Sequence, residues 1–277
     1  MIRGALSLAL LCCATAALAQ EDAPRPPERP AEAEAASAPP PKPEGDTPAE
    51  QEPEAEDAAG IDDPDEAATD EAEFFGPPMP PMQARLRETD QEFAACRLAL
   101  SLLGTVYEDQ PAATDPEIPD CGIARPIRVS QIIPGVELEG GALMRCSTAR
   151  ALGFWTRDFL RPAAAALPGA PQLQGMQLGT TYDCRGRVGS GDGGDKLSEH
   201  AFGNAIDIMG FHFDQAEPLP VQLRDEDGDA FEAFQKAARA SACLWFTTVL
   251  GPGSNAAHED HLHLDMAQRS SGWRLCD

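Results

Sequence analysis

Four of the five histidines of this chain fall in two short blocks, at residues 198–207 and 258–265. The first block reads Ser-Glu-His-Ala-Phe-Gly-Asn-Ala-Ile-Asp, and the second reads His-Glu-Asp-His-Leu-His-Leu-Asp. A histidine and a carboxylate in one block, together with a His-x-His in the other, can supply two imidazoles and one carboxylate. Catalytic zinc sites use that ligand set and leave a fourth position for water. The two blocks therefore predict a metal-dependent hydrolase.

The spacing of the second block suits a β-strand. His261 and His263 are two residues apart, so a strand would place both on one face, and Asp265 would join them. One imidazole could then bind a metal while its neighbour handles protons.

The first block requires a turn. His200 and Asp207 are seven residues apart, an odd number that would place them on opposite faces of an unbroken strand. We expect the turn at Gly203 and Asn204, because these residue types favour turns. His200 would then lie on a loop and Asp207 on the strand that follows.

The elements expected to position these blocks are three helices and four short strands. Thr89 and Glu92 form a capping-box pattern ahead of a helical run, and Gly104 ends it. We expect helices over residues 89–103, from about 147 to the residue before Pro162, and from 229 to about 243. We expect strands over residues 178–184, 205–211, 245–250 and 261–266. This order favours one α+β domain over residues 86–277.

The first 85 residues differ in composition from the rest. Residues 1–19 have a positive charge near the start at Arg3, continue through an apolar stretch and end in Ala-Leu-Ala. This pattern predicts a cleaved signal peptide and a periplasmic location. Residues 20–81 hold 19 of the 46 acidic residues and 15 of the 26 prolines, so we expect a disordered acidic Pro/Ala/Glu-rich tether over residues 20–85.

Composition also narrows the possible partners. The formal net charge of −25 argues against nucleic-acid binding, which needs basic surface patches. No stretch outside the expected signal peptide is long and apolar enough for a transmembrane helix. We expect a monomer.

The cysteines predict a disulfide framework. Loss of Cys12 and Cys13 with the signal peptide would leave Cys96, Cys121, Cys146, Cys184, Cys243 and Cys276. An even number in an exported protein predicts three disulfides, although the pairing stays open. Our hypothesis for one local pair is Cys96 with Cys121.

Several motifs resemble a known family. These are Cys121-Gly122-Ile123, Tyr182-x-Cys184-Arg185, Ser198-x-His200-x-x-Gly203-x-Ala205-x-Asp207, Leu250-Gly251-Pro252-Gly253 and the histidine-rich second block. Over about residues 96–267, the chain resembles the bacterial extensin-like C-terminal domain family. The two histidine blocks also resemble the motifs of the LAS superfamily of zinc peptidases, named for lysostaphin, D-Ala-D-Ala peptidases and the Hedgehog signalling domain.

The resemblance to the LAS superfamily implies a site and a scaffold. Zinc would be bound by His200, Asp207 and His263, on a small antiparallel sheet with flanking helices. Arg185 matches an arginine that contacts the peptide carbonyl or terminal carboxylate in the carboxypeptidases, a task that suits guanidinium geometry. A surface ion pair is the alternative role for Arg185.

The general base is where this chain departs from the D-Ala-D-Ala enzymes. Those enzymes have glutamate three residues before the last ligand, whereas this chain has Asp260, whose shorter side chain reaches less far. His261 is the other candidate, because the first histidine of His-x-His is the base in the endopeptidase branches. We favour His261 as the base, with Asp260 orienting it or sharing the proton. His258 could contact a ligand, but we favour an exposed loop.

Together these inferences predict an exported zinc peptidase that acts on peptidoglycan stem peptides or cross-links, as a carboxypeptidase or an endopeptidase. Two other classes remain open. One is an envelope protein that keeps the fold and binds wall peptides without cleaving them. The other is an iron oxygenase with two histidines and one carboxylate, although such sites usually lie in double-sheet β folds.

Overall fold

The computed structural model describes residues 79–187, 196–225, 228–269 and 271–277. The expected signal peptide and residues 20–78 of the expected tether lie outside these ranges. The helical elements are α1 (Met82–Arg85), α2 (Asp90–Leu103), α3 (Cys146–Trp155), the π-helical turn η1 (Thr156–Leu160), α4 (Arg161–Ala165), the 3-10 turn η2 (Glu199–Phe202), α5 (Ala230–Ala242) and the 3-10 turn η3 (Ala256–His258).

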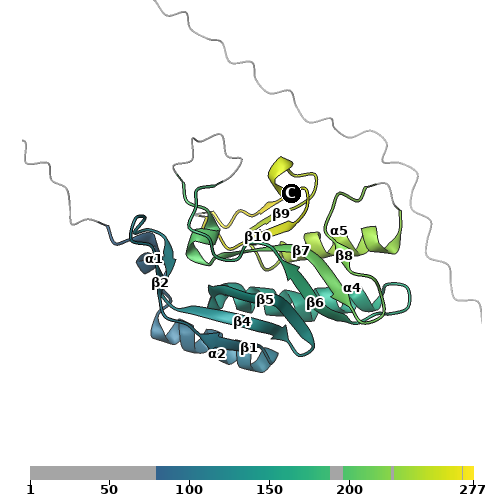
Figure 1. Ribbon diagram of the computed structural model, residues 1–277, viewed down its shortest axis with the longest axis horizontal. Coiled ribbons are helices and arrows are strands. Elements are labelled where there is room, and N and C mark those ends of the chain that lie inside the picture. The colour runs from purple at the N-terminus through teal and green to yellow at the C-terminus, as the bar shows by residue number, and fades with distance from the viewer. Residues whose placement is uncertain (1–78, 188–195, 226–227, 270) are drawn as a thin grey trace, which may run out of the picture. The chain divides into compact units, whose positions relative to one another are not determined.

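The strands of the described residues form one large sheet and one small one (Figure 1). They are β1 (Val106–Asp109), β2 (Ala113–Thr114), β3 (Gly122–Ile123), β4 (Pro126–Ile133), β5 (Val136–Arg145), β6 (Leu173–Leu178), β7 (Ala205–Phe213), β8 (Leu219–Pro220), β9 (Thr248–Leu250), β10 (Leu262–Asp265) and β11 (Leu275–Cys276). The large sheet has the order β1-β4-β5-β6-β7-β10-β9-β11, with β8 paired to β7, and β2 pairs with β3.

The expected α+β class is confirmed, but the expected small antiparallel sheet is wrong. The sheet has nine strands and is mixed, because β5 pairs with β6 and β9 with β11 in parallel. Parallel neighbours need a crossover connection, and the chain supplies one through α3, η1 and α4. The expected strand over residues 178–184 is wrong, because β6 ends at Leu178. The expected strands did not include β1 to β5, β8 or β11, although β4 and β5 largely alternate buried and exposed residues around a Pro134-Gly135 turn.

The first and third expected helices are confirmed. Thr89 caps α2 in a capping box with Glu92, and Gly104 ends it in the left-handed conformation, with φ 72°. The side chain of Asp229 accepts a hydrogen bond from the backbone N–H of Glu232 at the start of α5. These ends were predictable because the contacts are local in sequence.

The expected end of the second helix before Pro162 is wrong. Helical backbone begins at Cys146 and continues through η1 and α4 to Ala165. Pro162 lies in the first turn of α4, directly after the π-helical turn. Proline is tolerated there because the first turn of a helix does not need its N–H.

The two faces of β7 and β10 have different neighbours. One face of both strands packs into the main hydrophobic core with residues of α2, α3 and α5. The residues on this face are Ile206 and Ile208 of β7 and Leu262 and Leu264 of β10. Because side chains alternate along a strand, Asp207 projects from the face opposite to this core. The site residues of the two strands therefore lie on one side of the sheet and the core on the other.

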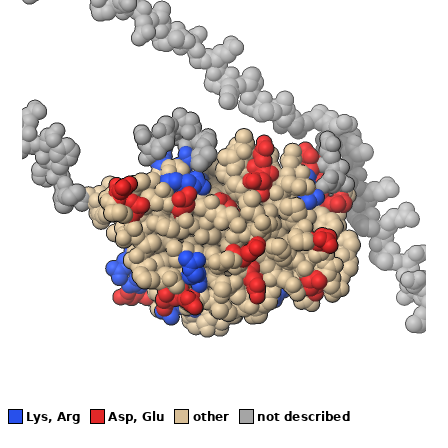
Figure 2. Space-filling model, viewed as in Figure 1, with Lys and Arg blue, Asp and Glu red and all other residues tan. Residues whose placement is uncertain are grey.

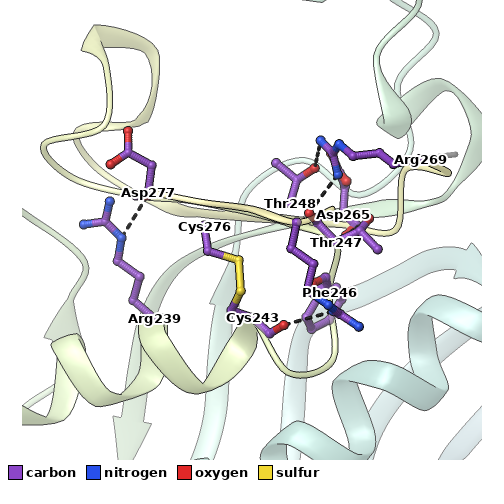
Figure 3. The surroundings of a disulfide bond; sticks show 10 residues. Arg239, Cys243, Phe246, Thr247, Thr248, Asp265, Arg269, Cys276 and Asp277 are labelled. Carbon is purple, nitrogen blue, oxygen red and sulfur yellow. Dashed lines mark hydrogen bonds between the residues drawn. A yellow bond between two sulfur atoms is a disulfide. The ribbon is translucent and has the colours of Figure 1, made fainter. Parts of the chain in front are cut away.

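Three disulfides join the six cysteines, as expected. The pairs are Cys96–Cys146, Cys121–Cys184 and Cys243–Cys276. The proposed pairing of Cys96 with Cys121 is wrong, because Cys96 on α2 faces the start of α3, while Cys121 packs with Ala201 and Phe202 in a separate cluster. The third disulfide ties the end of α5 to β11 (Figure 3).

A short helix precedes residue 86. Residues 82–85, which were assigned to the tether, form α1, and the Met82 N–H donates a hydrogen bond to Asp120 at 2.7 Å. Acidic and basic side chains are interspersed on the face shown in Figure 2. Within the described ranges, no helix has the length and apolar character needed to cross a membrane.

Candidate metal centre

His200 is held on the short turn η2, which precedes β7. Ser198 begins the turn, and Gly203 ends it with φ 62°. A Cβ at Gly203 would lie 2.2 Å from Cδ1 of Ile123, so a larger residue does not fit without a shift. The expected turn is therefore present, and it directs the chain from His200 into the strand of Asp207.

Asp207 and His263 are direct neighbours across the antiparallel pair β7–β10. The flanking residues of both strands point into the core, so these two side chains share the opposite face. His200 from η2 joins them, and the three residues are only 1%, 5% and 9% exposed for His200, Asp207 and His263. The structure thus brings together the three residues that the sequence suggested as metal ligands.

The three ligand atoms form a nearly equilateral triangle. His200 Nε2 lies 3.2 Å from both His263 Nδ1 and Asp207 Oδ1, and His263 Nδ1 lies 3.0 Å from the same Oδ1. Ligand atoms about 2.0–2.1 Å from a tetrahedral zinc ion are about 3.3 Å apart. The triangle therefore fits one such ion with small movements. Among the described residues, this is the group of histidines and carboxylates with the geometry for a metal.

Each histidine of the triangle has a partner for its second ring nitrogen. His263 Nε2 lies 3.1 Å from Asp265 Oδ2, and His200 Nδ1 lies 3.2 Å from the carbonyl oxygen of Thr181. Metal-binding imidazoles commonly donate their other N–H to a carboxylate or carbonyl, which fixes the tautomer and the ring orientation. The outer contacts therefore also fit a metal centre.

The electrostatics of the triangle favour a positive charge at its centre. Burial alone would raise the pKa of Asp207, but hydrogen bonds from His200 and His263 hold that pKa well below its usual range. Burial would lower the pKa of His263, but hydrogen bonds to Asp207 and Asp265 raise it to about 9. Without metal, a protonated imidazole lies between two carboxylates, and a bound cation would take over that role.

His261 lies beside the triangle and contacts Asp260. Its Nε2 is 3.7 Å from Asp207 Oδ1, and its Nδ1 is 2.8 Å from Asp260 Oδ1. The side chain of Asp260 is 74% exposed, whereas that of His261 is 15% exposed. The Asp260 carboxylate therefore binds the outer nitrogen of His261, while the inner nitrogen faces the triangle.

His258 lies beside the site and not on an exposed loop, which was the expected position. It ends the turn η3, which Asn255 caps, and its ring centroid lies 5.2 Å from that of His261 and 5.5 Å from that of His263. Its Nδ1 is 2.7 Å from Asn255 Oδ1. Burial, with the nearby His263 and His261, lowers the pKa of His258 to about 4. His258 is therefore neutral at pH 7.

A pocket of about 300 Å³ adjoins the triangle. Of the three triangle residues, His263 alone lines it. Its charged walls come from Arg185, Arg187, Glu199, Asp265 and Arg269. Arg185 lines the pocket, and it also forms an ion pair with Asp183 at 2.9 Å.

Sequence reasoning missed some residues of the site. Asp265 was placed on the face of His263, but its contact with Nε2 was not inferred, although i, i+2 spacing was a usable signal. The Thr181 carbonyl had no such signal, because any residue type can present one. Arg269 was missed because it follows the second block and reaches the pocket only through the fold.

The comparisons with known proteins give one match. A protein family described as "Extensin-like protein C-terminus" matches residues 94–277, about two thirds of the chain. Among curated proteins and solved structures, nothing matches. The matched range contains every residue of the triangle, the pocket and the three disulfides. The chain therefore belongs to the extensin-like protein C-terminus family.

Proposed function

We propose that this protein is an exported zinc peptidase that hydrolyses peptide bonds in peptidoglycan stem peptides or cross-links. The observation that carries the proposal is the triangle of His200, Asp207 and His263, whose edges of 3.0–3.2 Å suit a tetrahedral ion. Three protein ligands leave one position for reactants, as catalytic rather than structural zinc sites do. The resemblance of both histidine blocks to LAS motifs supports a peptidase.

Zinc, when bound, would supply a Lewis acid for the peptide carbonyl and lower the pKa of a coordinated water. We assign the proton transfer to His261. Its Nδ1–H donates to Asp260, so its Nε2 is free to accept a proton beside Asp207. The same nitrogen can deliver that proton to the leaving amine. Asp260 orients the ring and stabilises the imidazolium that forms.

Arg185 is the candidate for substrate positioning. It lines the pocket beside His263, and its side chain is 34% exposed. A guanidinium has five N–H donors, so the ion pair with Asp183 leaves donors for a peptide carbonyl or carboxylate. We assign Arg185 to binding the peptide rather than to proton transfer.

The periplasm is the proposed place of action. The signal-peptide pattern of residues 1–19 supports export, and three disulfides suit an oxidising compartment. A cell-wall substrate would be reached there.

Digestion of purified sacculi by the mature protein, with products resolved by mass spectrometry, tests the proposal. We expect release of defined peptide fragments, loss of release with a chelator, and recovery with zinc. His200→Ala should abolish both metal binding and release. His212→Ala is the matched control, because His212 is a partly exposed histidine of β7 outside the triangle.

Elemental analysis belongs to the same experiment. We expect about one zinc per wild-type chain and none in His200→Ala. Protein without metal in both forms contradicts the proposal. Iron in place of zinc would point to an oxygenase, and bound zinc without cleavage of any wall peptide would point to a wall-binding protein.

A further inference from the structure

Arg269 forms no ion pair within the ranges that the structure describes, yet it is held firmly. Its guanidinium donates to the Thr247 carbonyl at 2.7 Å and to Thr248 Oγ1 at 2.8 Å, and lies over the Trp273 ring at 5.1 Å from the centroid. These partners are neutral, so the positive charge of Arg269 is oriented but not neutralised.

The carboxylate drawn beside Arg269 in Figure 3 is already engaged. Asp265 accepts a hydrogen bond from His263 Nε2 at 3.1 Å and from the Ala267 N–H at 2.9 Å. It therefore serves the triangle and does not form an ion pair with Arg269.

The other two arginines of the pocket have acidic partners. Arg185 pairs with Asp183 at 2.9 Å, and Arg187 lies 3.5 Å from Glu199. Arg269 is thus the pocket arginine whose charge is available to a ligand. Two of its five N–H donors are used by the threonines, which leaves donors for an incoming anion.

The sheet fixes Arg269 relative to the triangle. Thr248 on β9 pairs in register with Asp265 on β10, and Asp265 contacts His263. The segment that carries Trp273 is itself anchored by the Cys243–Cys276 disulfide and by strand β11 (Figure 3). A ligand held by Arg269 would therefore have a defined position beside the triangle.

We propose that Arg269 is a specificity-determining residue that binds a carboxylate of the substrate in the pocket beside the triangle. This inference rests on the proposed function, because it takes the substrate to be a wall peptide. A planar guanidinium matches a carboxylate in two parallel hydrogen bonds. Since His263 alone of the triangle lines the pocket, the carboxylate lies to one side of the bond that is cleaved. Two sources share this chemistry: the C-terminal carboxylate of the peptide and an internal side-chain carboxylate.

Calorimetric titration distinguishes them. The titrated protein is the zinc-loaded mature chain with His261→Ala, so that the peptide is not consumed. The probes are a synthetic pentapeptide that ends in D-Ala-D-Ala and carries one internal carboxylate, its C-terminal amide, and the form with only the internal carboxylate amidated. This zinc-loaded His261→Ala protein is called the parent. Each peptide is titrated into the parent and into four variants of it, which add Arg269→Gln, Arg269→Lys, Arg185→Gln or Arg274→Gln. Arg274 is the matched control, because it donates to the Cys243 and Phe246 carbonyls from the same segment and does not line the pocket.

We expect Arg269→Gln to weaken binding of the acidic pentapeptide by about 10- to 100-fold, the size of a lost charged hydrogen-bond pair. The amidated peptide that lacks the recognised carboxylate should bind the parent as weakly as the acidic pentapeptide binds Arg269→Gln. Its affinity should not fall further when Arg269→Gln is added. Arg269→Lys should fall between, because it keeps the charge but loses the planar fork. Arg274→Gln should bind like the parent.

If Arg269→Gln and Arg274→Gln bind the acidic pentapeptide with equal affinity, the inference is wrong. It is also wrong if only Arg185→Gln loses the preference for the acid over the amide. The proposed function fails separately. If the parent shows the Arg269 effect but wild-type protein cleaves no peptide, the subsite stands without a peptidase. If wild type and Arg269→Gln cleave acid and amide alike, the peptidase stands without the subsite. If no peptide binds the parent, the subsite is wrong, and digestion of sacculi by the wild type then decides the proposed function.

Discussion

His263 on β10 lies directly opposite Asp207 on β7, with 3.0 Å between Nδ1 and Oδ1. Directly opposed side chains are the closest neighbours on one face of a sheet, so strand register places these two ligand atoms. His200 is then added by the turn η2. The candidate metal centre therefore depends on the sheet for two ligands and on one turn for the third. Four predictions test this centre and its surroundings.

Asp265→Asn should weaken zinc binding by about 10- to 100-fold, the usual effect of removing an outer partner of a metal ligand. The reason is the 3.1 Å contact of its carboxylate with His263 Nε2. Competition with a chromophoric chelator measures the affinity. Asp260→Asn is the matched control, since Asp260 contacts His261 instead, and it should leave zinc affinity unchanged. Similar losses in both variants would contradict the outer-partner role.

His261→Ala should retain zinc but reduce peptide hydrolysis by roughly 10²–10⁴-fold, the usual size of general-base catalysis. Asp260→Asn should cost less, because Asp260 orients the base through Nδ1. Steady-state kinetics on metal-replete protein measures both. A larger loss in Asp260→Asn, with a carboxylate controlling the acidic limb of the pH profile, would make Asp260 the base.

Zinc binding should release a proton near pH 7. In the metal-free protein, burial alone would lower the pKa of His263, but hydrogen bonds to Asp207 and Asp265 raise it to about 9. Below that pH the ion must displace the proton from Nδ1, so affinity should fall by up to about tenfold per pH unit as the pH decreases, and level off above it. Calorimetry in two buffers of different ionisation enthalpy measures the released proton. Identical heats in both buffers would rule this out.

Gly203→Ala should destabilise the domain by about 2–4 kcal/mol, because it combines left-handed strain with overpacking. Its φ is 62°, and the new Cβ would meet Ile123 at 2.2 Å. Gly135→Ala is the matched control, with φ 79° but no atom within 4 Å of the Cβ, and should cost only the strain of about 1–2 kcal/mol. Denaturant unfolding measures both, and equal losses would show that the close contact with Ile123 is relieved cheaply.

The sequence by itself determined the features whose physical cause is local. The capping box at Thr89, the left-handed stop at Gly104, the cap at Asp229 and the turn at Gly203 are each set by contacts within a few residues. The i, i+2 spacing predicted that His263 and Asp265 share one face, and His263 Nε2 lies 3.1 Å from Asp265 Oδ2. The candidate ligands could be chosen from sequence because few residue types bind zinc.

Only the tertiary structure decided the features that depend on distant segments. Cysteine spacing does not show which helix faces which, so it could not assign Cys96 to Cys146. The parallel pairing of β5 with β6 depends on how the intervening helices cross the sheet. Arg269 reaches the pocket because β9 lies beside β10, and its two hydrogen-bond acceptors lie on the first residue of β9, Thr248, and on the residue before it, Thr247. Such long-range contacts leave no period or spacing in the sequence, because they arise only when the strands pair and the core is buried.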